Sequence, residues 1–289
     1  MRASFVAPGK LVLAGEYAVI DGAPAIVAAV DRGVRCALSP AERLEIDAPD
    51  LRFVGPVLEG APPARFAFTP WNPAPTRTKA GFGSSAAAVV AALIAREHLE
   101  GVARDPAERL SVAMAHHRGA QGSGSGIDVA ASVFGGVLRF QGAAARALPD
   151  ITPLVVWSGR SAATGPRVER YLAWGGRSAF VDASTAIVDA FPEDPIRALE
   201  ANRLLLEAMA SEAGLDYRTP ALDAIGALAR GAGGAAKPSG AGGGDSAVAL
   251  FPDPEAAARF TLAVEGVGLI VIAVTLARAA HRAPGEDHE

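Results

Sequence analysis

The chain has 289 residues, of which half are hydrophobic and one fifth charged, so it can build one large domain or two ordinary ones and wholesale disorder is excluded. Its formal net charge is -4 and it has no long basic run, which argues against nucleic acid as a main partner. Cys36 is the only cysteine, which excludes an intrachain disulfide and a cysteine metal cluster. No apolar signal region opens the chain and no apolar run approaches the length of a membrane span, so we expect a cytoplasmic protein with no membrane partner.

Strand and helix signals alternate from the N-terminus. Short strand-like runs over residues 4–20 are broken by one proline and two glycines, which are Pro8, Gly9 and Gly15. Residues 25–38 continue with strand character, and Cys36 within them is expected to be a small buried side chain. Proline is frequent over residues 55–78, which predicts a loop with an edge strand.

Helix starts are marked by capping residues. Ser84 or Ser85 is expected to cap an alanine-rich helix that runs to about Glu100. Four more starts combine an Asp or Thr cap with a proline at the first helical position, namely Asp105-Pro106, Asp194-Pro195, Thr219-Pro220 and Asp253-Pro254. The helix after Pro106 should end near Gly119.

Strands are predicted between and after these helices, over residues 136–140, 153–157, 246–251 and 268–276. The polar residues after Arg278 are expected to be frayed. Together the elements predict an α+β fold rather than a regular βαβ winding. We expect an N-terminal lobe over residues 1–150 and a C-terminal lobe over residues 151–289.

Lysine is rare in this chain, and each of its three copies lies in a glycine-rich segment. Lys10 lies in APGKLVLAGE, Lys79 in KAGFGSSAA and Lys237 in KPSGAGGGD. Every other basic residue is arginine or histidine, so a retained lysine suggests a place that needs a compact ammonium group. Lysine beside a glycine-rich loop often holds phosphate oxygens, with chance as the alternative for Lys79 or Lys237 taken singly.

The segment KAGFGSSAAAVVAAL predicts an anion site. Its small residues let a ligand approach the backbone, and the helix behind them presents free N–H groups and the positive end of its dipole. The phosphates of a nucleotide are the natural occupants. The alternative is a tight turn that only caps the helix.

Three carboxyl and glycine features complete the pattern. In GSGSGIDVAASVFGG, Asp128 could accept a hydroxyl proton during phosphoryl transfer or could merely cap a helix. The four glycines of KPSGAGGGD lose much backbone entropy on folding unless a ligand packs against them, the alternative being an exposed flexible loop. Glu16 could hold Lys10 or nearby backbone, or could be an ordinary surface or helix-cap carboxylate.

Two adjacent histidines, His116 and His117, lie at the end of the helix that is predicted to start at Pro106. Neighbouring residues of a helix point about 100° apart, so the pair makes a poor joint metal site. We favour a contact with the C-terminal helix dipole or a hydrogen bond to substrate.

Taken in order, these segments resemble the three motifs of the GHMP kinase superfamily, named for its galacto-, homoserine, mevalonate and phosphomevalonate kinases. APGKLVLAGEYAV is similar to the first motif, KAGFGSSAA to the second and KPSGAGGGD to the third. The resemblance implies a two-lobed α/β fold, with an N-terminal ribosomal-S5-like lobe and a C-terminal ferredoxin-like lobe. It also implies a kinase that uses ATP and Mg²⁺; whether it is a monomer or a homodimer stays open.

Within the superfamily, three stretches resemble the phosphomevalonate kinases of isoprenoid biosynthesis, namely AGEYAV, AHHRGAQGSGSGIDVAASVFGG and WSGRSAATG. Mevalonate kinases usually carry a GEH version of the first motif and a magnesium-binding glutamate at the position of His117. Ser246 departs from the cysteine that phosphomevalonate kinases often have there. The resemblance implies ATP-dependent phosphorylation of 5-phosphomevalonate. The alternatives are mevalonate or another small alcohol as acceptor and, less favoured, a pathway decarboxylase or a ligand sensor without catalysis.

The resemblance also implies roles for individual residues. Lys10 and Asp128 would be catalytic, and Ser85 would help to hold magnesium. The nucleotide would contact Lys79, Gly81, Gly83, Ser84, Ser85 and Ala86. The substrate would contact Lys10, Glu16, Tyr17, Gln121, Ser123, Ser125, Gly126, Asp128, Ala163, Thr164, Ser239, Gly240, Ala241 and Gly242. The charge of two phosphates would be offset by Lys10 and Lys79 and, as a second group, by Arg77, Arg118, Arg160 and Arg167.

Overall fold

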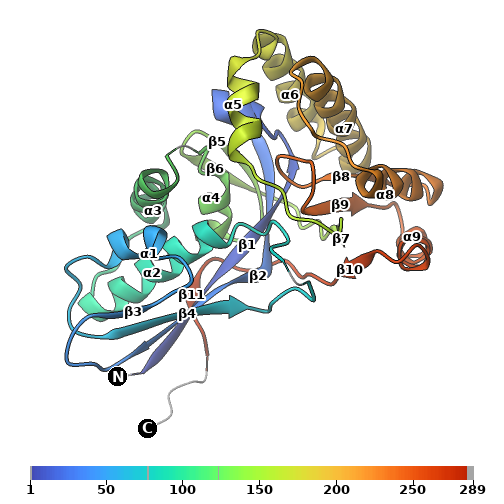
Figure 1. Cartoon of the computed structure of the whole chain (residues 1–289). Coiled ribbons are helices and arrows are strands. Elements are labelled where there is room, and N and C mark those ends of the chain that lie inside the picture. The colour runs from blue at the N-terminus through green and yellow to red at the C-terminus, as the bar shows by residue number, and fades with distance from the viewer. Residues whose placement is uncertain (1, 77, 123, 285–289) are drawn as a thin grey trace.

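The computed structural model describes residues 2–76, 78–122 and 124–284, which form two β-sheets with helices packed around them (Figure 1). The mixed α+β class predicted from the sequence is confirmed. The sheets separate between Leu148 and Leu154, but the last strand returns to the first sheet. The division into lobes at residue 150 stays a prediction. Within the described ranges, no helix is both long and apolar enough to cross a membrane.

The first sheet has seven strands in the order β11-β1-β2-β4-β3, with the β5-β6 hairpin paired to β2. Among the strand pairs of the described residues, β3-β4 alone is parallel. The strands are β1 (Ala3–Ala14), β2 (Ala25–Ser39), β3 (Glu45–Asp47), β4 (Arg65–Trp71), β5 (Val137–Gln141), β6 (Ala144–Leu148) and β11 (His281–Arg282).

β1 is one long strand, so the expectation of short runs broken by Pro8 and Gly9 was wrong. The register with β2 shifts between Ala7 and Gly9, which accommodates a proline that cannot donate a ladder hydrogen bond. The two strands approach closely at this point. A Cβ on Gly9 would lie 1.9 Å from the carbonyl oxygen of Arg32, so only glycine fits there.

Four helices share one hydrophobic core with the first sheet (Figure 1). The helices are α1 (Leu51–Leu58), α2 (Ser84–Glu100), α3 (Pro106–Gln121) and α4 (Ile127–Phe134). Two of them, α2 and α4, contact the strands, and α1 and α3 pack on these two helices. In this core Val12 and Val27 of the sheet lie with Val89 and Val90 of α2. The short 3-10 helix η1 (Ala18–Asp21) follows β1. Cys36 is fully buried in this core, as predicted.

Two expectations for residues 50–85 were wrong. The predicted loop over residues 55–78 begins instead with the end of α1, which tolerates Pro56 and is capped by Asp50. Its strand, β4, lies between β2 and β3 and is not an edge strand. Helix α2 is preceded by Gly83 at a φ of 72°, so neither serine is its N-cap. A left-handed glycine supplies the turn that the serines were expected to begin.

The second sheet has four antiparallel strands in the order β10-β7-β9-β8. They are β7 (Leu154–Trp157), β8 (Ala235–Pro238), β9 (Ser246–Leu250) and β10 (Ile270–Ile272). With α8 (Pro220–Gly231) and α9 (Pro254–Gly266) packed through Ile225 and Phe260 against it, this order matches the expected ferredoxin-like arrangement. The last predicted strand, over residues 268–276, keeps strand geometry only in β10.

Three more helices lie between β7 and β8, namely α5 (Gly165–Ala173), α6 (Arg177–Ala190) and α7 (Pro195–Glu212). The starts predicted from a cap followed by proline are confirmed in α3, α7, α8 and α9, in each of which the cap side chain accepts a backbone N–H. Helix α3 continues to Gln121, two residues beyond its predicted end. Neither α5 nor α6 was predicted: α5 follows Thr164 but has its proline at the second helical position and no side-chain cap, and α6 has no proline at its start.

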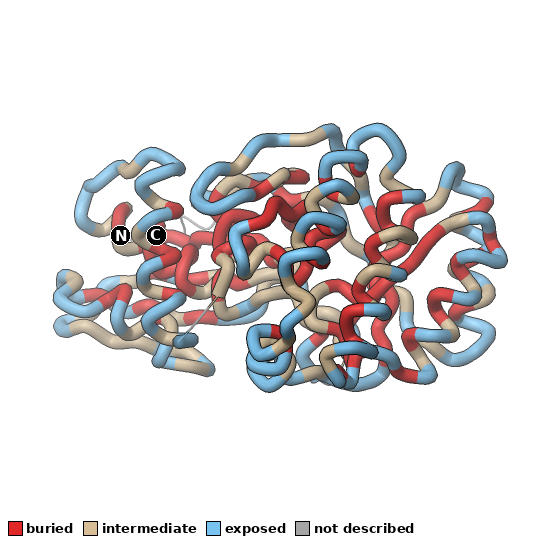
Figure 2. The backbone as a smooth tube through the Cα atoms, turned by 90° about the horizontal axis from the view of Figure 1, so that it is seen from above, coloured by how far each residue is buried: buried red, intermediate tan, exposed pale blue. Residues whose placement is uncertain are grey.

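The expectation of a frayed end after Arg278 was wrong for the described residues up to 284, and its remaining part, residues 285–289, lies outside the described residues. β11 pairs with β1, placing Phe5 opposite Arg282, and Ala283 donates to the carbonyl oxygen of Ser4 at 2.8 Å. Buried segments run through the interior of the molecule, and exposed segments lie at its periphery (Figure 2). A second core joins Leu11 and Ile26, on the far face of the first sheet, to Val248 of the second sheet.

Candidate active site

Lys10 lies where four segments that are far apart in the sequence meet. Its Nζ donates to the carbonyl oxygen of Gly81 at 3.1 Å. A Cβ on Gly83 would lie 3.1 Å from Lys10 Cγ and 3.6 Å from Asp128 Cβ, and a Cβ on Gly240 would lie 3.7 Å from Lys10 Nζ. Lys10 is therefore surrounded by residues of all three lysine-bearing motifs and by the start of α4.

The second motif forms a loop that leads directly into α2. Gly81 and Gly83 both have positive φ, at 83° and 72°, which favours glycine at each position. Among the described residues, no side chain caps α2 and no acidic residue lies in its first turn. The N–H groups and dipole of the helix are therefore available to an anion, and Ser84 beside them is exposed.

Other predicted nucleotide contacts lie around this loop. Lys79 is exposed, and its carbonyl oxygen accepts a 2.6 Å hydrogen bond from the hydroxyl group of Ser161. Ala86 is fully buried in the first core, so its side chain packs inside the protein. Only its backbone could face a nucleotide.

Asp128 lies in the first turn of α4, whose N-cap is Gly126. Its Oδ2 is 3.9 Å from Nε2 of His117, and the same nitrogen is 3.1 Å from the hydroxyl oxygen of Ser85. His117 is 2% exposed and stacks on Phe53. His117 was expected to contact substrate or a helix dipole, and its place between Ser85 and Asp128 could not be read from its own helix.

The charge of Lys10 is balanced by three carboxylates from different segments. Burial lowers the pKa of Lys10, whereas Asp128, Asp245 and Glu16 raise it. Asp245 was missing from the predicted site. Burial raises the pKa of Asp245, and the N–H of Ala162 together with Lys10 and Arg167 lowers it.

Glu16 belongs to a buried network rather than to an open surface. Its Oε1 pairs with Nζ of Lys237, and its Oε2 accepts a 2.8 Å hydrogen bond from Asn202. Lys237 also donates to the carbonyl oxygens of Val12 and Pro238 at 3.3 and 2.9 Å. Burial lowers the pKa of Lys237, and Glu16 opposes this. Lys237 therefore stabilises the start of the glycine-rich loop through buried contacts.

Two predicted substrate contacts use their polar groups to hold that loop. The hydroxyl group of Tyr17 donates to the carbonyl oxygen of Ala241 at 2.6 Å. The hydroxyl oxygen of Ser239 accepts from the backbone N–H of Val12 at 2.9 Å. Gly242 packs on the ring of Tyr217, where a Cβ would lie 2.1 Å from the ring. The loop therefore has a fixed conformation despite its glycines.

The remaining predicted substrate contacts that the structure describes belong to two segments, one from the end of α3 to the start of α4 and the other just before α5. Gln121 is exposed at the end of α3, and the hydroxyl oxygen of Ser125 is 3.4 Å from the N–H of Ile127. Ala163 and Thr164 are exposed just before α5. Ser123 lies outside the described residues.

Three of the arginines proposed for phosphate, namely Arg160, Arg167 and Arg118, donate to backbone carbonyl groups. Arg160 Nε reaches Gly243 at 2.9 Å, and Arg167 reaches Ala163 at 2.6 Å and Asp216 at 3.1 and 3.2 Å. Arg118 is exposed and donates to Gly124 at 3.3 Å. Arg77 lies outside the described residues.

The donor set beside α2 fits a magnesium ion. Mg²⁺ is usually bound by one or two protein oxygens together with phosphates and water, not by a cage of protein ligands. The oxygens of Ser85 and Asp128 both lie near His117, at 3.1 and 3.9 Å from its Nε2. No group of three or more His, Cys, Asp and Glu side chains that could hold a metal occurs in the described part of the chain.

Comparisons with known proteins agree with this geometry. The model of the GHMP kinases N terminal domain matches residues 68–136, and that of the GHMP kinases C terminal matches residues 189–268. Phosphomevalonate kinase of Streptomyces sp. (strain CL190) is 30% identical, over 88% of this chain and 91% of that relative. Mevalonate kinase of Thermococcus sibiricus is 29% identical, over 57% of this chain and 60% of that relative. The crystal structure of the Lin0012 protein from Listeria innocua has a TM-score of 0.89 at 24% identity, over 99% of this chain and 100% of that one.

Proposed function

The chain belongs to the GHMP kinase superfamily, and from that premise we propose that it transfers the γ-phosphoryl group of MgATP to 5-phosphomevalonate, giving 5-diphosphomevalonate and ADP. The observation that carries phosphoryl transfer is the convergence of Lys10, Asp128 and the open N-terminus of α2. The choice of acceptor is supported by the Streptomyces phosphomevalonate kinase, whose similarity extends over both lobes.

In this proposal the loop before α2 holds the phosphates of ATP. Its N–H groups and helix dipole stabilise anionic oxygens, because no acidic side chain lies in the first turn among the described residues. The Lys10 ammonium group, bonded to the carbonyl group of Gly81, lies at the edge of the same loop. It stabilises the charge that develops on the transferred phosphoryl group.

Magnesium, held by Ser85 and Asp128 together with the nucleotide phosphates, would neutralise phosphate charge and orient the groups. Asp128 also raises the pKa of Lys10 and so favours its charged form. An acceptor phosphate is already anionic at neutral pH, since its second pKa is about 6. Asp128 is therefore more important for orientation than as an obligatory base.

A second candidate is transfer to the hydroxyl group of mevalonate or another small alcohol. One observation favours it. Among the described residues, Lys10 is the lysine whose pKa Asp128 and Asp245 raise. Arg167 also acts on Asp245, whereas Lys237 pairs with Glu16. These two carboxylates and two cations leave the described centre of the site without excess positive charge, which suits a neutral acceptor better than a phosphate. A neutral hydroxyl group would then need Asp128 as its base.

The test is the release of ADP from MgATP by the purified protein with 5-phosphomevalonate, mevalonate, homoserine and galactose supplied separately. We expect turnover with 5-phosphomevalonate alone. Turnover confined to mevalonate would favour the alcohol kinase, and turnover confined to homoserine or galactose would reject both.

The variant Asp128→Asn sharpens this choice. With a phosphate acceptor we expect kcat to fall about 10-fold, because the charge that orients Lys10 is lost but no proton has to be removed. With an alcohol acceptor the loss should be about 10²–10⁴-fold, the usual contribution of a general base. Asp253→Asn, the same change at the N-cap of α9, is the matched control and should leave kcat unchanged.

A further inference from the structure

Asp245 ends the glycine-rich loop and directly precedes β9. Its φ is 55°, and among the described residues only three that are not glycine have a positive φ. Aspartate tolerates this conformation better than most residues, but it remains less favourable than an extended one. Backbone strain of this kind persists where the surroundings require it, often at functional sites.

The contacts of Asp245 join it to the segment over residues 158–164. Its Oδ1 accepts the N–H of Ala162 at 3.1 Å, its own N–H donates to Arg160 at 2.8 Å, and its carbonyl oxygen accepts from Ser158 at 3.0 Å. Ser161 in the same segment donates to the carbonyl oxygen of Lys79. The residue thus fixes a segment that itself reaches the phosphate-binding loop.

Asp245 also packs directly on the phosphate-binding loop. A Cβ on Gly81 would lie 2.8 Å from Asp245 Cβ and 3.0 Å from its Oδ2. Next in the chain, Ser246 donates to the carbonyl oxygen of Ala80 at 2.7 Å. On the other side of this turn, Gly81 accepts the hydrogen bond from Lys10 Nζ. Gly81 is therefore in contact with both the carboxyl group and the ammonium group.

We propose that Asp245 is a positioning residue of the phosphoryl-transfer site, which fixes the turn at Gly81 and, together with Asp128, keeps Lys10 charged and directed at the phosphate-binding loop. The inference rests on the proposed phosphoryl transfer. It goes beyond it, because no role implied by the family resemblance falls on Asp245.

The charged groups around Lys10 are few. Asp128 from α4, Asp245 from the glycine-rich loop and Glu16 after β1 favour its charged form, and Lys237 from β8 is the like charge. Arg167 of α5 acts on Asp245 itself. Glu16 is paired with Lys237 and Asn202, so its charge is largely compensated. Asp128 and Asp245 are the carboxylates left to balance Lys10.

The simpler alternative is that Asp245 only makes a turn. The variant Asp245→Asn distinguishes a positioning role from a turn. Asparagine also adopts positive φ and can still accept the N–H of Ala162, but it lacks the charge. Asp245→Gly is a second variant that removes the charge and relieves the backbone strain. If one variant does not fold, the other still tests the charge.

Chemical labelling of lysine tests the proposal without requiring turnover. Only the neutral amine reacts with an acylating reagent, so the pH dependence of labelling, read by mass spectrometry, follows the pKa of each lysine. Removal of a nearby carboxylate lowers the pKa of Lys10. We therefore expect half-labelling of Lys10 at lower pH in Asp245→Asn than in the parent protein. Exposed Lys79 is the internal reference, and Asp253→Asn is the control that should not shift Lys10.

Kinetics gives the second readout. Since Lys10 must be protonated to act, activity is lost as pH rises through its pKa, and this loss should begin at lower pH in Asp245→Asn. We expect kcat to fall about 10-fold at neutral pH, with little change in the KM for ATP. An unchanged pH profile of Lys10 labelling in a folded variant would overturn the proposal. If Lys10 labelling shifts but no acceptor gives turnover, the positioning role stands and the proposed function fails.

Discussion

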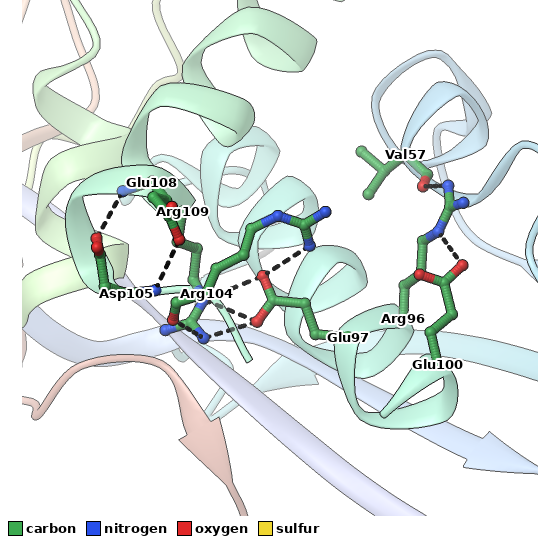
Figure 3. A network of polar contacts seen from close by, with 8 residues as sticks. All are labelled: Val57, Arg96, Glu97, Glu100, Arg104, Asp105, Glu108 and Arg109. Atoms are coloured by element: carbon green, nitrogen blue, oxygen red, sulfur yellow. Dashed lines mark hydrogen bonds and ion pairs between the residues drawn. The ribbon is translucent and has the colours of Figure 1, made fainter. Parts of the chain in front are cut away.

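Ion pairs surround the C-terminal end of α2, whereas the N-terminal end faces a glycine-rich loop. At the C-terminal end, Glu97 is 3% exposed and accepts from Arg109 at 2.6 Å and from Arg104 at 3.4 Å (Figure 3). Arg96 pairs with Glu100 at 2.7 Å and also donates to the carbonyl oxygen of Val57 (Figure 3). These contacts join α2 to α1 and to the start of α3.

The N-terminal end of α2 lacks such partners in the described ranges. Gly83 precedes it, no side chain caps it, and its first turn contains no carboxylate. By contrast, the capping side chains of α3, α7, α8 and α9 each accept a backbone N–H. One helix thus has an end stabilised by protein charges and an end whose dipole is left for a ligand. We therefore expect substitutions at the C-terminal end of α2 to change stability, and substitutions at its N-terminal end to change ligand binding.

The largest expected effect comes from Lys10→Ala. The variant removes the ammonium group beside the ligand end of α2, so we expect kcat to fall about 10²–10³-fold. The thermal midpoint should change little, because within the described part of the chain Lys10 makes no salt bridge and its ammonium group donates one hydrogen bond, to Gly81. Steady-state release of ADP and a thermal melt measure the two quantities. A kcat within a few-fold of the parent value would remove Lys10 from the mechanism.

The second largest expected effect is a loss of stability at the C-terminal end of α2. Glu97→Ala leaves Arg109 and Arg104 without their carboxylate, and we expect the free energy of unfolding to fall by about 2 kcal/mol. The value is below that of a fully buried pair, since the two arginine side chains are 20% and 31% exposed. Urea denaturation measures it, with Glu100→Gln as the control expected to lose about 0.5 kcal/mol or less. A similar loss in both variants would contradict a special role for Glu97.

The smallest expected effect is in Ser84→Asp, in which the protein should become slightly more stable while its binding of ATP becomes weaker. Ser84→Asp places a carboxylate in the first turn of α2, which should raise the free energy of unfolding by about 0.5 kcal/mol through the helix dipole. The same charge repels phosphate, so the KM for ATP should rise about 10-fold. Ser84→Asn is the neutral control. If Ser84→Asp binds ATP as tightly as the parent protein does, the nucleotide phosphates do not lie at this helix end.

Local sequence signals predicted the parts of the fold that depend on near neighbours. The cap-proline pairs gave four helix starts correctly, because the cap and the N–H groups that it accepts are three residues or fewer apart. The glycine-rich segments were interpreted as ligand-binding loops. The structure brings Gly81, Gly83 and Gly240 close to Lys10, with positive φ at all three, while their contacts with nucleotide and substrate stay predictions.

Apart from the cap of α2, where Gly83 replaces the expected serine, the errors discussed next have a common physical cause, which is contact between segments far apart in the chain. Pro8 and Gly9 remain in a strand because β2 accommodates them with a register shift. His281 and Arg282, near the polar end of the described chain, form a strand because they pair with β1. Asp245 follows a run of glycines, and the sequence assigned it no role. Its packing on Gly81 is a contact across more than 160 residues, which no local pattern reports.

The most direct test of phosphoryl transfer to a phosphate is the ³¹P NMR spectrum of the reaction with MgATP, mevalonate and 5-phosphomevalonate present together. We predict a new pair of mutually coupled phosphorus signals besides those of ADP, from the P–O–P bond of 5-diphosphomevalonate, with mevalonate unchanged. Growth of a single phosphate monoester signal as mevalonate is consumed would contradict the proposal and identify an alcohol kinase.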